Sequence, residues 1–135
     1  MTNPNPCVLV VDDSPTVQQQ LAAELQTLGF RVIATDCAET GLELLLNHSF
    51  DLALVDYQLP GHDGLWLIEQ ARAKFYALPC MLLTVHRSVE VAVTATQLGA
   101  PYVLKPLKEG ELWIAIQQAH AFQKLYQQRV EAAAD

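Results

Sequence analysis

Five polar side chains lie at the end of a short apolar segment or just after it. They are the carboxylates of Asp12, Asp13 and Asp56, the hydroxyl of Thr84 and the ammonium of Lys105. Neighbouring carboxylates repel one another unless a proton or a cation compensates. Hard oxygen ligands suit Mg²⁺ or Mn²⁺, and a carboxylate beside such a metal is a competent nucleophile toward phosphorus. If the fold gathers these side chains, they predict Mg²⁺-dependent formation of an aspartyl phosphate, with the ammonium and hydroxyl contacting the phosphoryl group.

Short apolar runs alternate along the chain with longer segments of helical periodicity. Runs that are apolar throughout predict strands buried on both faces of a parallel sheet. The predicted strands are residues 7–11, 31–35, 51–55, 80–84 and 102–104. The predicted helices are residues 15–28, 38–47, 64–74, 88–98 and 108–130. Five strand–helix units in a row predict the α/β class, a doubly wound, five-stranded parallel sheet with right-handed crossovers.

A sheet of five strands favours the flavodoxin-like order 2-1-3-4-5, in which ligands bind beyond the carboxyl ends of the strands. This order places the ends of the first, third, fourth and fifth strands side by side, so the five polar side chains converge in one crevice. The loop at residues 12–15 is acidic and lacks glycine. It would repel a phosphate in the absence of a metal, which argues against a flavin-binding electron carrier.

Composition and charge exclude several classes of protein. The chain has 135 residues, enough for one domain, and 51% of them are hydrophobic, so it can bury a core. A net charge of −7 argues against binding nucleic acid. The sequence shows no targeting peptide and no apolar run near the roughly 20 residues of a membrane span, so we expect a cytoplasmic protein. Cys7, Cys37 and Cys80 are expected to be buried small hydrophobic residues in a reducing compartment, with a redox or metal role as the alternative.

Four motifs, in this order and spacing, resemble the receiver domain of response regulators in two-component signal transduction, and in particular the chemotaxis-type receivers. The motifs are VLVVDDSP at 8–15, DLALVDYQLPGHDGL at 51–65, MLLT at 81–84 and YVLKP at 102–106. The resemblance covers about residues 6–120. It implies that Asp56 is the phosphoacceptor and that Asp13 binds Mg²⁺ (or Mn²⁺) directly. Asp12 would act mainly through metal-bound water, and the backbone carbonyl of Gln58 would be a further ligand beside Asp56.

The resemblance also implies roles around the phosphoryl group. Thr84 and Lys105 would contact it, and Tyr102 would be the aromatic switch that turns inward as Thr84 moves. Pro106 would follow Lys105 through a cis peptide bond. Tyr102 could instead be plain packing, and the pair Asp12 and Asp13 could merely favour the following helix N-terminus.

Three positions depart from the family pattern. Val85 stands where an alanine or glycine is usual, and its β-branched side chain could narrow access to Asp56 and slow phosphorylation. Gln58 and His86 occupy the variable positions that influence the lifetime of the phosphoryl group, unless they are loop residues without kinetic effect. Pro101 alone links Ala100 to Tyr102, where two residues are common, which weakens the expectation of signalling through the fifth strand and its neighbouring helices.

The chain is expected to divide into a receiver domain at 1–120 and a helical extension or linker at 121–135. The extension could pack on the domain, form a coiled coil with a partner, or lead to an output domain. The predicted function is a phosphorylation-activated switch that accepts phosphate from a sensor histidine kinase or a histidine phosphotransfer protein. It is not an enzyme, apart from self-phosphorylation and autodephosphorylation. A phosphate-independent interaction module is the alternative, and pairing with a second copy stays open.

His48, His62 and His120 are expected at the surface, since no metal-ligand spacing links them.

Overall fold

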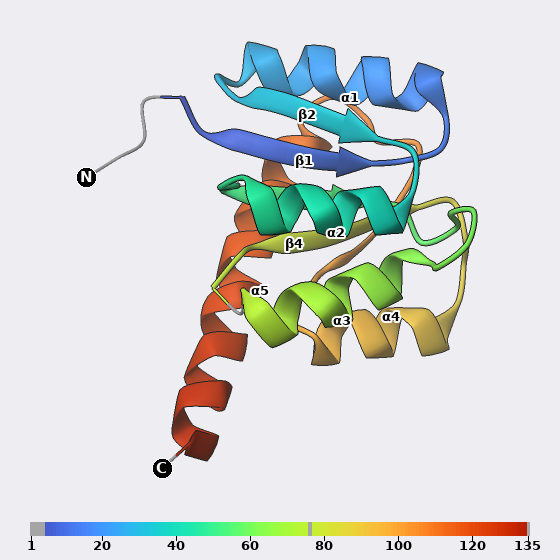
Figure 1. The fold of residues 1–135 in the computed structure, drawn as a ribbon. Coiled ribbons are helices and arrows are strands. Elements are labelled where there is room, and N and C mark those ends of the chain that lie inside the picture. The colour runs from blue at the N-terminus through green and yellow to red at the C-terminus, as the bar shows by residue number, and fades with distance from the viewer. Residues whose placement is uncertain (1–4, 76, 135) are drawn as a thin grey trace.

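Strands and helices alternate strictly along the chain in the computed structural model, which describes residues 5–75 and 77–134 (Figure 1). The strands are β1 (Cys7–Val11), β2 (Arg31–Thr35), β3 (Leu52–Val55), β4 (Cys80–Thr84) and β5 (Tyr102–Leu104). The helices are α1 (Pro15–Thr27), α2 (Ala38–Asn47), α3 (Gly64–Lys74), α4 (Val89–Gln97) and α5 (Glu111–Ala134). The five predicted strand–helix units are therefore confirmed.

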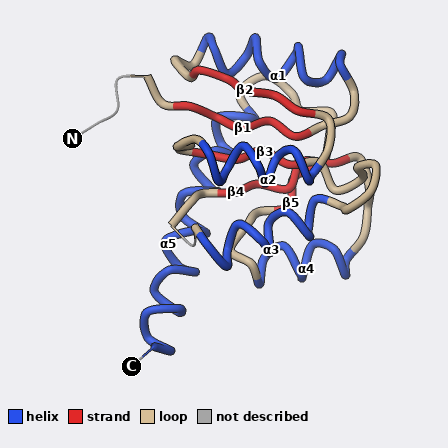
Figure 2. The backbone as a smooth tube through the Cα atoms, viewed as in Figure 1, coloured by secondary structure: helices blue, strands red, loops and turns tan. Residues whose placement is uncertain are grey.

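The strands form one parallel sheet in the order β2-β1-β3-β4-β5, as predicted (Figure 2). Strand β1 lies at the centre, with Val11 paired with Thr35 of β2 on one side and with Val55 of β3 on the other. Thr84 of β4 pairs with Leu104 of β5. This register brings the carboxyl ends of β1, β3, β4 and β5 to one edge, where the predicted crevice should lie.

Two apolar cores cover the two faces of the sheet, because successive strand residues point to opposite faces. Leu9, Val11 and Leu82 belong to the core that includes residues of α2, α3 and α4. Val8 and Leu83 belong to the core that includes residues of α1 and α5. Burial on both faces explains why the strands read as continuous apolar runs rather than as alternating patterns.

Capping residues set the ends of several helices. Ser14 caps α1, with its hydroxyl accepting a hydrogen bond from the backbone N–H of Val17, and Pro15 occupies the first helical position. Ser88 caps α4 in the same manner. Gly29 and Gly99 follow α1 and α4 with φ of 94° and 74°, a region that favours glycine. Both helices lie within one residue of their predicted bounds of 15–28 and 88–98.

Helix α5 differs from its predicted range at both ends. It begins at Glu111 rather than at residue 108, because Gly110 has a φ of 82°, which a right-handed helix cannot include. It runs to Ala134 rather than to residue 130, and its last turns project beyond the rest of the fold (Figure 1). Gln123 is still buried, so packing on the domain continues past residue 120. The domain boundary at 120 stays a prediction.

Candidate functional site

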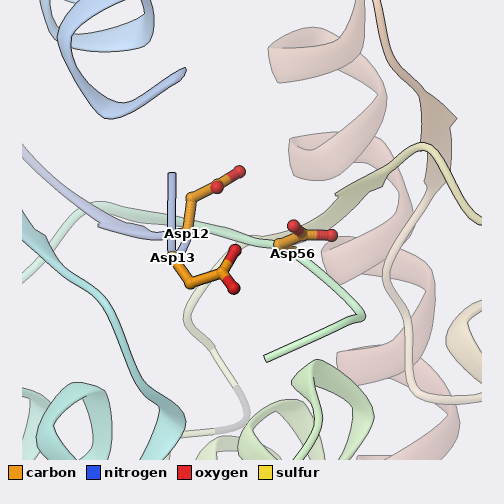
Figure 3. Close-up of side chains that lie close together, drawn as sticks. All are labelled: Asp12, Asp13 and Asp56. Carbon is orange, nitrogen blue, oxygen red and sulfur yellow. The ribbon is translucent and has the colours of Figure 1, made fainter. Parts of the chain in front are cut away.

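Three carboxylates meet at the carboxyl edge of the sheet. Asp12 and Asp13 follow β1, and Asp56 follows β3; each offers an oxygen atom within 4.8 Å of the others. Figure 3 shows the three side chains together, with the Asp13 carboxylate turned toward Asp56. Asp12 and Asp56 are buried, with exposed fractions of 3% and 7%, and Asp13 is exposed. The acid cluster (Asp12, Asp13 and Asp56) thus has two buried members and one that faces solvent.

Lys105, which follows β5, is the cation of the acid cluster. Its Nζ lies 2.6 Å from Oδ2 of Asp12 and 3.3 Å from Oδ2 of Asp56. When the three carboxylates are ionised, this ammonium offsets one of three negative charges. The Lys105–Pro106 peptide bond is cis, as predicted. The ammonium therefore spans the two buried acids and leaves the cluster negative.

Asp56 has one carboxylate oxygen with a partner and one without. Oδ2 accepts a hydrogen bond from Lys105. Among the residues that the structure describes, Oδ1 of Asp56 is the buried side-chain polar atom with no hydrogen-bond partner. A buried acceptor without a partner is costly, and such groups in native proteins commonly have a functional explanation. This oxygen is therefore available to a ligand.

The backbone around Asp56 holds its side chain in place. Its N–H donates to the carbonyl of Val11 over 2.9 Å, which ties the end of β3 to the end of β1. The N-terminus of α3 then approaches closely, since a Cβ atom on Gly64 would lie 2.1 Å from the carbonyl oxygen of Asp56. Position 64 must therefore be glycine for this packing. The DG pair at 63–64 was part of a motif, but its packing role was not predicted.

Side-chain hydrogen bonds fix Asp12 as well. Its Oδ1 accepts from the backbone N–H of Ser14 over 2.9 Å. Gln18 of α1 donates through Nε2 to the backbone carbonyls of both Asp12 and Thr35. No motif in the sequence indicated this role of Gln18. Asp12 is thus held in place by Lys105, by the backbone amide of Ser14 at the start of α1 and by Gln18 within α1.

Thr84 connects the site to the β4–α4 loop (residues 85–88). Its side chain has no exposed surface, and its Oγ1 accepts a hydrogen bond from the backbone N–H of His86 over 3.1 Å. The hydroxyl of Tyr102 donates to the carbonyl of His86 and accepts from the N–H of Ser88 over 3.1 Å. Tyr102 is half-buried and packs against the core. The two predicted switch residues therefore contact the same loop.

Gln58 and His86 face each other across the mouth of the crevice. Nε2 of Gln58 lies 3.4 Å from Nδ1 of His86, and the His86 ring stacks on Tyr57 with centroids 5.0 Å apart. Gln58 and Asp13 border the same hollow. The two predicted variable positions are thus in contact, through a stacking partner that the sequence did not indicate.

A second hollow, of about 300 Å³, lies on the other side of Lys105, between α1 and the segment that follows β5. Its apolar lining includes Val17 and Leu21 of α1 together with Leu107. Val85 also lines it and is 61% exposed. Val85 therefore stands at a rim of the crevice, beside an apolar surface.

Residues outside the crevice behave as predicted, with one exception. His48, His62 and His120 are exposed. Cys7 and Cys80 are buried, whereas Cys37 is half-exposed and donates to the hydroxyl of Thr40. The expectation of buried thiols is therefore met at two of the three positions. No helix in the described part of the chain is long and apolar enough to cross a membrane.

Comparisons with known proteins agree with this geometry. The family model of the response regulator receiver domain matches residues 8–117. The regulatory protein AtoC of Escherichia coli is 31% identical over 119 residues, covering 87% of this chain and 26% of AtoC. The transcriptional regulatory protein FixJ of Bradyrhizobium diazoefficiens is 32% identical over 113 residues, covering 83% of this chain and 55% of FixJ. The chain thus spans between about a quarter and about half of the length of these relatives.

Solved structures give the same result for the fold. A CheY-like receiver domain from Methanospirillum hungatei superposes with a TM-score of 0.82 at 28% identity, covering 89% of this chain and 97% of that one. TrrA from Thermotoga maritima, solved in complex with Mg²⁺–BeF, gives a TM-score of 0.77 at 26% identity, covering 84% and 98%. Nothing in these comparisons supports the phosphate-independent alternative. The chain belongs to the response regulator receiver family, whose members are phosphorylation-activated switches rather than enzymes and bind Mg²⁺ in an acidic pocket.

Proposed function

We propose that this chain takes a phosphoryl group on Asp56, and that Oδ1 of Asp56 is the attacking atom. One observation carries the assignment. Oδ1 is a buried carboxylate oxygen without a hydrogen-bond partner among the described residues, whereas Oδ2 of the same side chain is paired with Lys105. A nucleophile must have a lone pair that is not already engaged by another group, and Oδ1 meets this condition.

The donor set of the acid cluster fits a divalent cation. The three carboxylates each offer an oxygen within 4.8 Å of the others, only two of them are paired with Lys105 among the described residues, and all their donor atoms are hard oxygens. Asp13 and Asp56 would bind Mg²⁺ or Mn²⁺ directly, with the backbone carbonyl of Gln58, and Asp12 would act through metal-bound water. When bound, the ion neutralises negative charge on the transferring phosphoryl group.

The residues of this chain supply the other parts of the transfer. A bond forms between Asp56 and phosphorus while the bond from phosphorus to the donor's histidine nitrogen or acyl oxygen breaks, and the leaving group keeps the electron pair. Lys105 stabilises the charge on the phosphoryl oxygens, and the Thr84 hydroxyl donates a hydrogen bond to one of them. Autodephosphorylation reverses the change, because water attacks phosphorus and the bond to Asp56 breaks.

Two further features support the switch and the approach of the phosphodonor. Receiver domains interact with histidine kinases. The hollow beside Lys105 is lined by Val17, Leu21 and Val85. It offers an apolar surface next to the crevice on which a sensor kinase or a histidine phosphotransfer protein can bind. When Thr84 turns toward phosphate, the β4–α4 loop moves with it and changes the hydrogen bonds that hold Tyr102.

Other parts of the assignment rest on the family. We expect the domain to act in the cytoplasm and to signal through an output partner or an attached output domain. Pairing with a second copy is a further form of output that fits this assignment. Residues 1–120 would form the receiver and 121–135 its extension.

The test is the intact mass of the protein after incubation with Mg²⁺ and acetyl phosphate. We expect one phosphoryl adduct on the wild type and none on Asp56→Asn. Asp36→Asn is the matched control, because Asp36 is exposed and follows β2, whose end lies outside the crevice; it should take up phosphate like the wild type. An adduct that persists in Asp56→Asn, or wild-type protein that takes none from acetyl phosphate or from a phosphohistidine donor, would refute the proposal.

A further inference from the structure

Helix α3 carries a buried arginine that the phosphotransfer chemistry does not use. Arg72 is 5% exposed. Its Nε donates to the carbonyl of Leu98 over 2.6 Å and its Nη2 to the carbonyl of Gly99 over 3.2 Å, and its Nη1 donates to the carbonyl of Leu78. Leu98 and Gly99 form the C-terminal end of α4, where unpaired carbonyls and the helix dipole attract a cation. Arg72 therefore ties α3 to the C-terminus of α4.

The same guanidinium contacts the last part of α5. Its Cζ lies 5.0 Å from the centre of the Tyr126 ring, a cation–π distance. Tyr126 also lies so close to Gly99 that a Cβ atom on Gly99 would stand 2.5 Å from Cβ of Tyr126. The Arg72 junction (Arg72, Leu98, Gly99 and Tyr126) thus joins α3, α4 and the C-terminal extension (residues 121–134).

The other end of α4 is attached to the phosphorylation site. Ser88 caps the helix, and its N–H donates to the hydroxyl of Tyr102. Two residues earlier, His86 donates to Thr84. Helix α4 has nine residues and is short enough to move as one body. A displacement of the β4–α4 loop at its N-terminus therefore reaches Leu98 and Gly99 at its C-terminus.

We propose that the Arg72 junction transmits phosphorylation to the C-terminal extension, which follows the C-terminal end of α4 because Tyr126 packs directly against Gly99. The inference rests on the proposed function, because it requires Thr84 to respond to phosphate. The switch acts by repositioning the extension relative to α3. Phosphorylation shifts the equilibrium between two arrangements of α4 and thereby between two positions of the last turns of α5.

The experiment measures the distance between α3 and the extension by pulsed electron spin resonance on the full chain. Spin labels are placed at Glu69→Cys and Ala133→Cys, both exposed positions, in a Cys37→Ser background; Cys7 and Cys80 are buried. Spectra are recorded with Mg²⁺ alone and with Mg²⁺ and beryllofluoride. We expect beryllofluoride to shift the wild-type distance distribution.

Three variants separate the junction from the rest of the helix. Tyr126→Ala should lose the shift, because the ring contact with Arg72 and Gly99 is gone. Tyr126→Phe keeps the ring and should keep the shift. Lys124→Ala is the matched control, since Lys124 is exposed on the same turn and does not line the hollow between α4 and the extension, so it should also keep the shift. Arg72 itself is left intact, because removing a buried cation could unfold the chain.

Two outcomes would overturn the inference. In the first, Tyr126→Ala shifts as the wild type does. In the second, the wild type shows no shift although acetyl phosphate gives an adduct on Asp56. If no adduct forms from any donor, the proposed function falls, and the inference falls with it.

Discussion

Asp56 combines two oxygens with different surroundings in one carboxylate. Oδ2 is held by Lys105, and Oδ1 has no partner among the described residues. Lys105 in turn lies closer to Asp12 than to Asp56, at 2.6 Å against 3.3 Å. The ammonium thus has a resting partner and can move toward an incoming phosphoryl group without leaving Asp12 far behind. This asymmetry prepares Asp56 for attack while it stabilises the buried acids.

Replacing Val85 tests how the rim controls access to this oxygen. Val85→Ala should speed phosphorylation by acetyl phosphate roughly threefold to tenfold, which corresponds to about 1 kcal/mol in the barrier. The physical reason is that the alanine side chain lacks the two methyl groups that Val85 carries directly after Thr84 and beside Lys105. The rate is followed by intact mass over time. An unchanged rate would show that Val85 does not limit access.

The three cysteines should differ sharply in reactivity. Burial raises the pKa of the Cys80 thiol above its ordinary value of 9.0, and burial also raises the pKa of Cys7. The thiolate is the reactive form, so iodoacetamide at neutral pH should label Cys37 first and the other two only after unfolding in urea. Peptide mapping by mass spectrometry identifies the labelled residue. Labelling of Cys80 in the folded protein at the rate of Cys37 would contradict this.

The same raised pKa values predict a decline of stability in alkali. Above pH 9 the unfolded thiols lose protons that the buried thiols retain, so the folded state binds more protons. The free energy of unfolding therefore falls as the pH rises past about 9, a trend that urea unfolding at several pH values checks. Replacing Cys80 by alanine should reduce the slope, and an equal slope in both proteins would refute this cause.

Helix α3 and strand β3 meet at a contact that has no room for a side chain. The first residue of α3 is Gly64, which stands against the carbonyl of Asp56. Asp63 caps the helix by accepting from the N–H of Trp66 over 2.9 Å, and this fixes where the helix begins. The placement of the phosphoacceptor thus depends on the start of the next helix as much as on its own strand.

Gly64→Ala should therefore be destabilising. Its Cβ would overlap the Asp56 carbonyl, and such overpacking costs about 1–3 kcal/mol. We expect slower phosphorylation as well, because Asp56 would be displaced. Urea unfolding measures the first effect and intact mass the second.

Gly29→Ala provides the control. Gly29 has open space around it but a φ of 94°, so it should cost about 1–2 kcal/mol without affecting phosphorylation. A Gly64→Ala variant that unfolds and reacts like the wild type would refute the steric argument.

The elements and the acid cluster were predictable from the sequence because they depend on local rules. Continuous apolar runs indicate buried parallel strands, and polar residues at their ends indicate the crevice. The Gly64 contact and the stacking of His86 on Tyr57 were not predictable, because each depends on how segments from different elements are placed in space. The predicted start of α5 at residue 108 was wrong, because the sequence pattern did not reveal the left-handed conformation of Gly110. Nothing distinguished Arg72 from the other basic residues.

The whole chain responds to its ligands because they bind the folded state alone. The acid cluster comes from β1 and β3, and Lys105 from beyond β5, so the unfolded chain cannot offer the same site. Binding of a cation to the folded state adds to the free energy of unfolding by mass action. The stability of the fold therefore depends on whether a cation is bound at this edge of the sheet.

Mg²⁺ should raise the unfolding temperature of the wild type. At a concentration one hundred times its Kd, the gain in unfolding free energy is about 2.7 kcal/mol. Differential scanning calorimetry with and without Mg²⁺ measures the effect. Asp13→Asn should lose most of the increase, whereas Asp36→Asn should keep it; equal increases in all three proteins would argue against Asp13 as a ligand.

The ion pair between Lys105 and Asp12 joins residues 93 positions apart, and that between Lys105 and Asp56 joins residues 49 positions apart. Closing such long loops is entropically unfavourable until much of the sheet exists to hold their ends. During refolding, collapse and helix formation can precede this step, but the arrangement of these three side chains cannot. The capacity to accept a phosphoryl group therefore requires the assembled sheet, so we expect an unfolded or misfolded chain to lack it.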